Sequence, residues 1–226
     1  MMCAVPWHCR EREPSCAEAL VWHSSGNGKN EESADDASLV RSIALWIEAA
    51  ISSSPCAPAP HVVTVSSPRA TLSLSLSLSL SFHASQVFHA LEVPEISITN
   101  YLARIVKYGE VSTSTLVIAL IYVDRLIRTR PEITLHPRTA HRLVLSATLI
   151  AAKYNEDVHL SNGAFATIGG VTVREVNRLE AAFLGMCGFS LAVPPGAYQE
   201  AVSAFAEYGR AQEGEARHGL ISGGEP

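Results

Sequence analysis

Cysteine and histidine, the residue types best suited to hold a metal ion, gather near the amino terminus of the chain. The chain has five cysteines, at Cys3, Cys9, Cys16, Cys56 and Cys187. The first three, together with His8 and His23, offer zinc-ligand types, but their spacing fits no common zinc template and no Cys-x-x-Cys pair occurs. We therefore expect reduced, scattered thiols, with no metal and no cofactor.

Residue patterns that would support catalysis are absent from the sequence. Neither Gly-x-Ser-x-Gly nor His-Glu-x-x-His occurs. Glu156 and Asp157 are adjacent, so on a helix they point to different sides and do not form a catalytic pair. The stretch from Gly26 to Lys29 lacks the glycine spacing and the following Ser or Thr of a phosphate-binding loop. We expect a protein that is not an enzyme.

Charge and composition exclude further classes. The net charge is −5 and no long block of Lys or Arg is present, which argues against a nucleic-acid-binding protein. No uninterrupted apolar run is long enough to span a membrane, and the amino terminus does not resemble a secretory signal. We expect a nuclear or cytoplasmic protein.

The first 85 residues show little sustained periodicity, and we predict a disordered, low-complexity extension. Within it, residues 39–51 can form an amphipathic helix, either as an accessory element or as an isolated helix that frays. The Leu-Ser repeat of residues 72–81 formally matches a strand, but a lone strand has no sheet to join. We favour a low-complexity tract without a packed role.

From residue 86 to residue 209 the pattern changes to a series of helices joined by short loops, which predicts one domain followed by a flexible tail at 210–226. The expected helices cover residues 94–109, 115–127, 139–157, 164–168, 173–188 and 196–208. Pro94, Pro137 and Pro195 mark helix starts. Thr172 and Glu175 are predicted to form a capping box at the start of the fifth helix.

The helix at 115–127 is apolar nearly all round, so we expect it to lie at the centre with the others packed about it. Asp124 and Arg125 near its end are then predicted to be structural, paired with backbone or charge. In the helix at 139–157, Leu143, Ala147 and Ile150 mark one face together with Tyr154.

Three segments, in this order and spacing, resemble the cyclin box: IYVDRLI, LVLSATLIAAKYNED and NRLEAAFLGMCGFSL. The pattern IxxYLxRIxKYxxxSxSxxVxAxxYxDR is similar to that of the single-box plant cyclins called P- or U-type, relatives of fungal phosphate-regulatory cyclins. The resemblance covers about Phe88 to Tyr208, and residues 1–85 find no counterpart. It implies an all-α fold: a five-helix cyclin box with flanking helices.

The resemblance also implies a function. A cyclin of this type is a regulatory subunit that binds a cyclin-dependent protein serine/threonine kinase as a heterodimer and activates it, in cell-cycle or phosphate-signalling control. The third and fifth helices face the kinase. Lys153 and Glu180 match the polar contacts of the family, Ile150 and Phe189 match its apolar contacts, and Asp124 matches a structural aspartate.

Taken alone, each of these residues has a simpler interpretation. Lys153 suits a helix carboxyl end because of the helix dipole. Glu180 could be solvated or paired with Arg142 or Lys153, and Ile150 and Phe189 could belong to the core. The alternative function is a cyclin-fold scaffold or transcription-associated adaptor without kinase activation, because a fold does not dictate a function. Kinase pull-down followed by a kinase assay separates the two.

Overall fold

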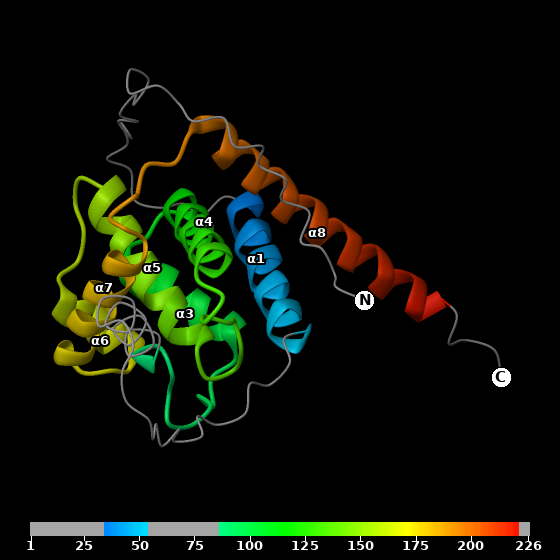
Figure 1. Cartoon of the computed structure of the whole chain (residues 1–226). Helices are drawn as coiled ribbons and strands as arrows, with labels where there is room; N and C mark the ends of the chain where they lie inside the picture. Colours follow the sequence, from blue (N-terminus) through cyan, green and yellow to red (C-terminus); the bar gives the residue numbers. More distant parts are fainter. Residues whose placement is uncertain (1–33, 54–85, 222–226) are drawn as a thin grey trace, which may run out of the picture.

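A computed structural model of the chain describes residues 34–53 and 86–221, and within these ranges it is helical with no strand. The helices, labelled as in Figure 1, are α1 (Ala34–Ser53), α3 (Ile98–Gly109), α4 (Thr113–Thr129), α5 (Ala140–Asn155), α6 (Asn162–Gly169), α7 (Val173–Met186) and α8 (Pro195–Ile221). The predicted all-α class is confirmed. The amino-terminal cysteines, the Leu-Ser tract, and the expected disorder at 1–33 and 54–85 lie outside the described residues.

Helices α3 to α7 form the expected five-helix array, with α1 and α8 beside it. Figure 1 shows α4 and α5 in the middle, α6 and α7 on one side, and α1 and α8 on the other. One continuous hydrophobic core joins the described helices. The arrangement agrees with a central helix surrounded by others, as the apolar pattern of the second helix predicts.

The central position of α4 follows from its composition. Leu116, Val117 and Leu126 are among its fully buried side chains. Its amino end is capped by Ser112, whose Oγ accepts a hydrogen bond from the Thr115 amide at 3.1 Å. Glu156, just beyond α5, accepts from the Ser112 amide at 3.1 Å and so ties the end of α5 to the start of α4.

Two helices begin later than their prolines predict. Helix α3 starts at Ile98 rather than at Pro94, because Ser97 takes an extended backbone and accepts a hydrogen bond from the Asn100 amide at 3.2 Å. Helix α5 starts at Ala140 rather than at Pro137. In both places the chain first makes a turn after the proline, so the proline precedes the helix without opening it.

Helix α1 belongs to the packed structure. Its predicted apolar face is buried: Ile43 and Ile47 have no exposed surface, and the Trp46 ring meets the Phe205 ring of α8 edge to face at 5.6 Å. Glu48 accepts a hydrogen bond from the Thr99 hydroxyl of α3 at 2.6 Å. The helix does not stand alone, since α3, α4 and α8 cover the face that would otherwise meet water.

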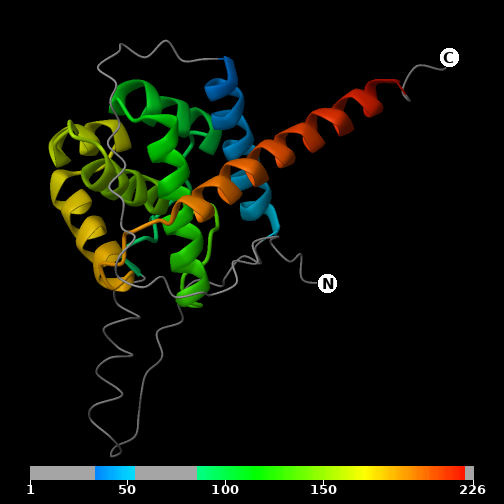
Figure 2. The same cartoon turned by 90° about the horizontal axis from the view of Figure 1, so that it is seen from above.

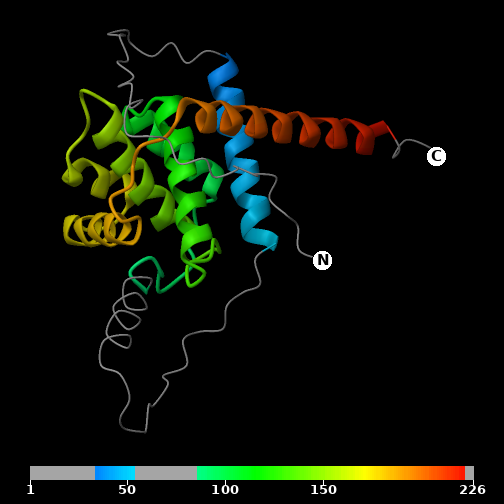
Figure 3. The same ribbon diagram turned by 45° about the horizontal axis from the view of Figure 1, so that its top comes forward.

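Helix α8 continues to Ile221, beyond Tyr208, where the sequence predicts its end. Figures 2 and 3 show that it crosses α1 and then extends past the other helices. The crossing is close at Gly209: a Cβ atom there would collide with the Ser42 hydroxyl and lie 2.9 Å from Ser42 Cβ. Only a glycine therefore lets the two helices approach this far.

The segment that leads into α3 is held against the start of α5. Phe88 is fully buried and its ring meets that of Phe183 edge to face at 6.1 Å. The Arg142 guanidinium donates to the carbonyls of Val87 at 3.1 Å and His89 at 2.9 Å. These contacts begin close to residue 86, where the helical pattern of the sequence also begins.

Histidines also meet in this region. The rings of His89 and His136 have centroids 4.9 Å apart, and the His141 ring donates through Nε2 to the Ile96 carbonyl oxygen at 2.9 Å. Burial lowers the pKa of all three histidines; nearby Arg138 lowers the pKa of His89 and His136 further, whereas the backbone hydrogen bond partly offsets the effect of burial on His141. His136 Nε2 and His141 Nδ1 are buried without a hydrogen-bond partner.

We predict that Gly209→Ala is less stable than Gly214→Ala by about 1–3 kcal/mol, the usual cost of overpacking, because both variants gain about the same 1 kcal/mol in helix propensity. Urea unfolding followed by circular dichroism measures the change. Gly214→Ala is the matched control, because a Cβ at this position of the same helix meets no atom within 4 Å. Equal stabilities for the two variants would show that the α1–α8 crossing is not close.

We also predict that the free energy of unfolding decreases as the pH falls below the ordinary histidine pKa of 6.5. The three histidines have lowered pKa values in the folded chain, so between those values and 6.5 the unfolded chain binds more protons. The stability they contribute is present above pH 6.5 and is lost as the pH falls through the folded pKa values. His136→Asn should flatten the dependence measured by urea unfolding at several pH values. An unchanged profile in this variant would contradict the assignment.

Candidate partner-binding surface

Lys153 and Glu180 meet on the surface where α5 and α7 pack together. Lys153 lies in the last turn of α5, and its Nζ donates to Glu180 Oε1 at 2.6 Å. The side chains are 31% and 17% exposed, respectively, so both charges can be reached from solvent.

A third residue completes this arrangement. Asn162, the first residue of α6, donates through Nδ2 to Glu180 Oε2 at 2.8 Å and to Asn177 Oδ1 at 2.7 Å. Each carboxylate oxygen of Glu180 therefore has its own donor, one from α5 and one from α6. Three helices meet at a single carboxylate.

Of the alternatives that the sequence leaves open for Glu180, the structure selects pairing with Lys153. Arg142, the other candidate, forms an ion pair with Glu175 instead. Thr172 caps α7, as predicted, by accepting from the Glu175 amide at 3.2 Å. The Glu175 carboxylate, expected to complete a capping box, points instead to Arg142 and links α7 to α5.

Phe189 follows α7 and is 71% exposed. Helix α7 ends in a Schellman motif: the Phe189 amide donates to the Leu184 carbonyl at 3.0 Å and the Gly188 amide to the Gly185 carbonyl at 3.3 Å. Phe189 itself has a left-handed backbone, with φ of 58°. Such a backbone costs about 1–2 kcal/mol outside glycine, so the surrounding contacts must hold it.

Two residues of α4 hold the segment around Phe189. The Arg125 guanidinium donates to the Ser190 carbonyl at 2.9 Å and to the Ala192 carbonyl at 3.2 Å. The Tyr122 hydroxyl donates to the Leu191 carbonyl at 2.7 Å. Burial raises the pKa of Tyr122 to about 12, so the phenol remains a donor at neutral pH. The buried helix thus positions an exposed aromatic side chain.

The end of α5 lies close to this segment. Asn155 at the end of α5 lies near the Tyr122 hydroxyl and opposes the effect of burial on the pKa of Tyr122. Tyr154 is 57% exposed, so its predicted place on the buried face is wrong. It lies in the last turn of α5. Tyr154 therefore adds an exposed aromatic ring next to Lys153.

Ile150 belongs to the core, which is the simpler of the two interpretations of this residue. It is only 2% exposed and packs in the core of the domain, so it offers almost no surface to a partner. We leave it out of the surface that we name the α5–α7 surface, which consists of Lys153, Tyr154, Glu180 and Phe189.

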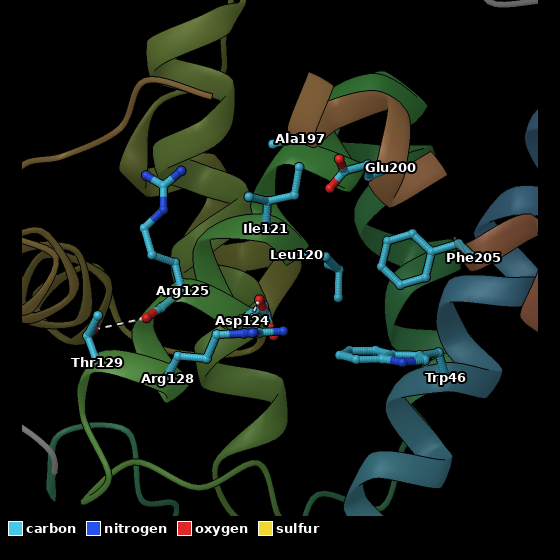
Figure 4. Close-up of a pocket in the computed structure, with 10 residues that line it drawn as sticks. All are labelled: Trp46, Leu120, Ile121, Asp124, Arg125, Arg128, Thr129, Ala197, Glu200 and Phe205. Atoms are coloured by element: carbon cyan, nitrogen blue, oxygen red, sulfur yellow. Dashed lines mark hydrogen bonds and ion pairs between the residues drawn. The ribbon is translucent and has the colours of Figure 1, made fainter. Parts of the chain in front are cut away.

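Asp124 pairs with Arg128 one turn later at 2.7 Å, in agreement with a structural role. It lies at a hollow of about 370 Å³ between α1, α4 and α8. In Figure 4, Trp46 and Phe205 form one wall of this hollow, while the Arg125 guanidinium points away from them. The hollow is formed by helices that carry none of the α5–α7 surface, and its Asp124 carboxylate is already paired.

The chemical groups of the described residues can be compared with those of metal sites, membrane spans and protein-binding surfaces. Among them, no group of three or more His, Cys, Asp or Glu side chains is placed to hold a metal ion. No helix in the described ranges is both long and apolar enough to cross a bilayer. The α5–α7 surface combines charged donors and acceptors with exposed aromatic rings, which is the composition of a protein-binding patch.

The sequence predicts that Arg125 pairs with backbone or charge, and Arg125 does donate to two carbonyls. It does not predict the positioning roles of Tyr122 and Asn162. Arg125 and Tyr122 were visible as polar groups in an apolar helix, a signal that each must find a buried partner. No nearby residue in the sequence indicates that their hydrogen-bond acceptors are carbonyls of the segment after α7. No sequence pattern predicts the role of Asn162, because its contact partner Glu180 lies 18 residues away along the chain.

Comparisons with known proteins agree on one family. The family model described as Cyclin matches residues 29–191, more than half of the chain. Its match begins before the region in which the sequence alone resembles a cyclin box, and it includes α1.

Curated relatives give the same result. The chain is 38% identical to cyclin-U4-1 of Arabidopsis thaliana over 112 residues, which are 50% of this chain and 55% of the relative. It is 39% identical to cyclin-P4-1 of Oryza sativa subsp. japonica over 115 residues, 51% of this chain and 54% of the relative. It is 43% identical to cyclin-U3-1 of Arabidopsis thaliana over 109 residues, 48% and 49%. The chain spans about half the length of the curated relatives it matches.

We predict that Arg125→Ala releases the segment that carries Phe189. The variant loses two hydrogen bonds to carbonyls, which should cost on the order of 1–3 kcal/mol, and amide exchange in residues 187–193 should accelerate while helix content stays the same. Hydrogen–deuterium exchange with mass spectrometry measures the exchange rate of this segment. Arg174→Ala, which removes an exposed arginine of α7, is the control. Equal protection of the segment in both variants would show that Arg125 does not hold it.

Proposed function

This chain belongs to the cyclin family, and from that membership we propose that it is a regulatory subunit that binds and activates a cyclin-dependent protein serine/threonine kinase, in cell-cycle or phosphate-signalling control. The observation that carries the proposal is the α5–α7 surface. Lys153 and Glu180 lie next to each other there, 2.6 Å apart, rather than buried or on opposite sides of the domain.

The charged pair supports binding to backbone groups of a partner. A lysine ammonium has three hydrogens, and the contact with Glu180 uses one of them. The remaining donors are available to carbonyl oxygens, while the carboxylate retains lone pairs that can accept from amides. Because each charge already has a partner, burying the pair in a heterodimer leaves neither charge uncompensated.

The exposed aromatic rings support binding energetically. Phe189 and Tyr154 are 71% and 57% exposed in the free chain. Each can lose apolar surface to a partner, at about 25 cal/mol per Å². Aromatic residues are enriched at protein interfaces, and tyrosine is among the residue types enriched in hot spots. Since the backbone around Phe189 is held by Arg125 and Tyr122, little conformational entropy is lost when it binds.

Activation would follow from a shift in population. A kinase alone keeps its regulatory helix away from the active arrangement, in which a lysine and a glutamate of the kinase pair around ATP. A partner that binds only the active arrangement shifts the equilibrium by its differential affinity, about 5.5 kcal/mol for a change from 1% to 99% active. In this proposal the chain contributes binding energy and no catalytic group.

We predict that Lys153→Glu weakens kinase binding by about tenfold or more. The change removes the donor and places a second carboxylate beside Glu180, and losing one partner of a buried charge pair at an interface costs about 2–5 kcal/mol. The full chain is co-purified with each of a set of plant cyclin-dependent kinases, and affinity and phosphate transfer to a protein substrate are measured.

Lys107→Glu is the matched control, because it reverses an exposed charge in the last turn of α3, outside the α5–α7 surface. Both variants should keep the circular dichroism of the wild type. Normal kinase binding by Lys153→Glu would remove the site assignment. Binding of the wild type without any rise in kinase activity would favour the scaffold or adaptor function instead.

A further inference from the structure

Asn162 holds the Glu180 carboxylate from the side opposite Lys153. Its Nδ2 lies 2.8 Å from Glu180 Oε2, whereas Lys153 Nζ lies 2.6 Å from Oε1. Both hydrogens of the Asn162 amide have acceptors, since Asn177 Oδ1 lies 2.7 Å away. Because both neighbouring atoms are acceptors, the group of the Asn162 amide that faces them is the nitrogen and not the oxygen.

The ion pair alone would not fix these side chains. Lysine and glutamate are long, and holding both in one geometry costs rotamer entropy that a partly exposed ion pair scarcely recovers. Asn162 differs because its side chain is short and leaves few rotamers. It therefore restricts the carboxylate far more than a second long side chain would.

Helix α6 gives Asn162 a rigid base. Phe165 is fully buried. Ser161 caps the helix by accepting from the Ala164 amide at 3.3 Å, and a Schellman motif around Gly170, with φ of 67°, ends it. The Arg104 guanidinium of α3 donates to the Thr167 carbonyl at 3.0 Å. Helix α6 is therefore tied to α3, and it also packs against α7.

We propose that Asn162 is a positioning residue of the partner-binding surface: it holds Glu180, and through Glu180 also Lys153, in the arrangement that a kinase partner receives. The inference rests on the proposed function and adds to it a residue from a helix that carries none of the contact groups. It follows that the charge of residue 162, and not only its size, decides partner affinity.

The Asn162→Asp variant separates positioning from a purely structural role. Aspartate has the size of asparagine, and a negative charge in the first turn of α6 suits the helix dipole. If Asn162 has a purely structural role, Asn162→Asp should have normal or improved stability and should bind the kinase normally. If Asn162 positions Glu180, the kinase affinity of Asn162→Asp should fall at least tenfold, because the new carboxylate repels Glu180. The thermal unfolding midpoint should stay the same.

A double-mutant cycle tests whether Asn162 acts through Glu180. Kinase affinity is measured for the wild-type full chain, Asn162→Ala, Glu180→Ala and the double variant. We expect Asn162→Ala to weaken binding about three- to thirtyfold in the wild-type background and less than twofold when Glu180 is absent. Asn100→Ala, an exposed asparagine in the first turn of α3, is the control and should bind as the wild type does.

The free chain provides a measurement that needs no kinase. The side-chain amide signals of Asn162 in a ¹⁵N-correlated NMR spectrum should shift on Glu180→Gln, because a charged acceptor is replaced by a neutral one. Unshifted signals would overturn the contact.

The experiments distinguish failure of the proposed function from failure of the proposed role of Asn162. If the wild type binds none of the kinases, the proposed function is overturned and the positioning role with it. If the wild type binds, Glu180→Ala weakens binding and both Asn162 variants bind normally, only the role of Asn162 is overturned. Equal losses for Asn162→Ala in both backgrounds would likewise show that it does not act through Glu180.

Discussion

The structure depends on enclosing α4, a helix that is apolar nearly all round. Such a helix is stable in water only when other elements cover every side, and here α5, α8 and α1 pack directly against it. The requirement accounts for α1, which adds Ile43 and Ile47 to the same core. It also accounts for the close α1–α8 crossing at Gly209, because the two helices together cover the side of the array away from α6 and α7.

Enclosure of α4 has a consequence at the surface. The polar groups that α4 does contain, Tyr122 and Arg125, cannot be left without partners in a covered helix. They find three successive carbonyls in the segment after α7. The same hydrogen bonds that satisfy the interior therefore hold the exposed Phe189. In this way a stability requirement of the core determines how the exposed Phe189 segment is held.

The α5–α7 surface is arranged so that its charges are compensated before any partner binds. Lys153 and Asn162 each supply a donor to one oxygen of Glu180, and the residues come from three helices. In the proposed complex, a partner would meet an ordered and nearly neutral polar group on a surface that also carries exposed aromatic rings. This lowers the entropy and desolvation costs of association, which would otherwise consume much of the energy of the contacts.

Caps and apolar periodicity act over a few residues, so the sequence predicts the number and order of helices α3 to α8, the Thr172 cap and the central place of α4, but not every helix end. It also identified Lys153 and Glu180 through a family resemblance. Tertiary structure alone decided that Ile150 is buried and Tyr154 exposed, and that α1 joins the core. Which side of a helix is covered, and which distant donor reaches a carboxylate, depends on how helices cross, and that geometry leaves no local pattern in the chain.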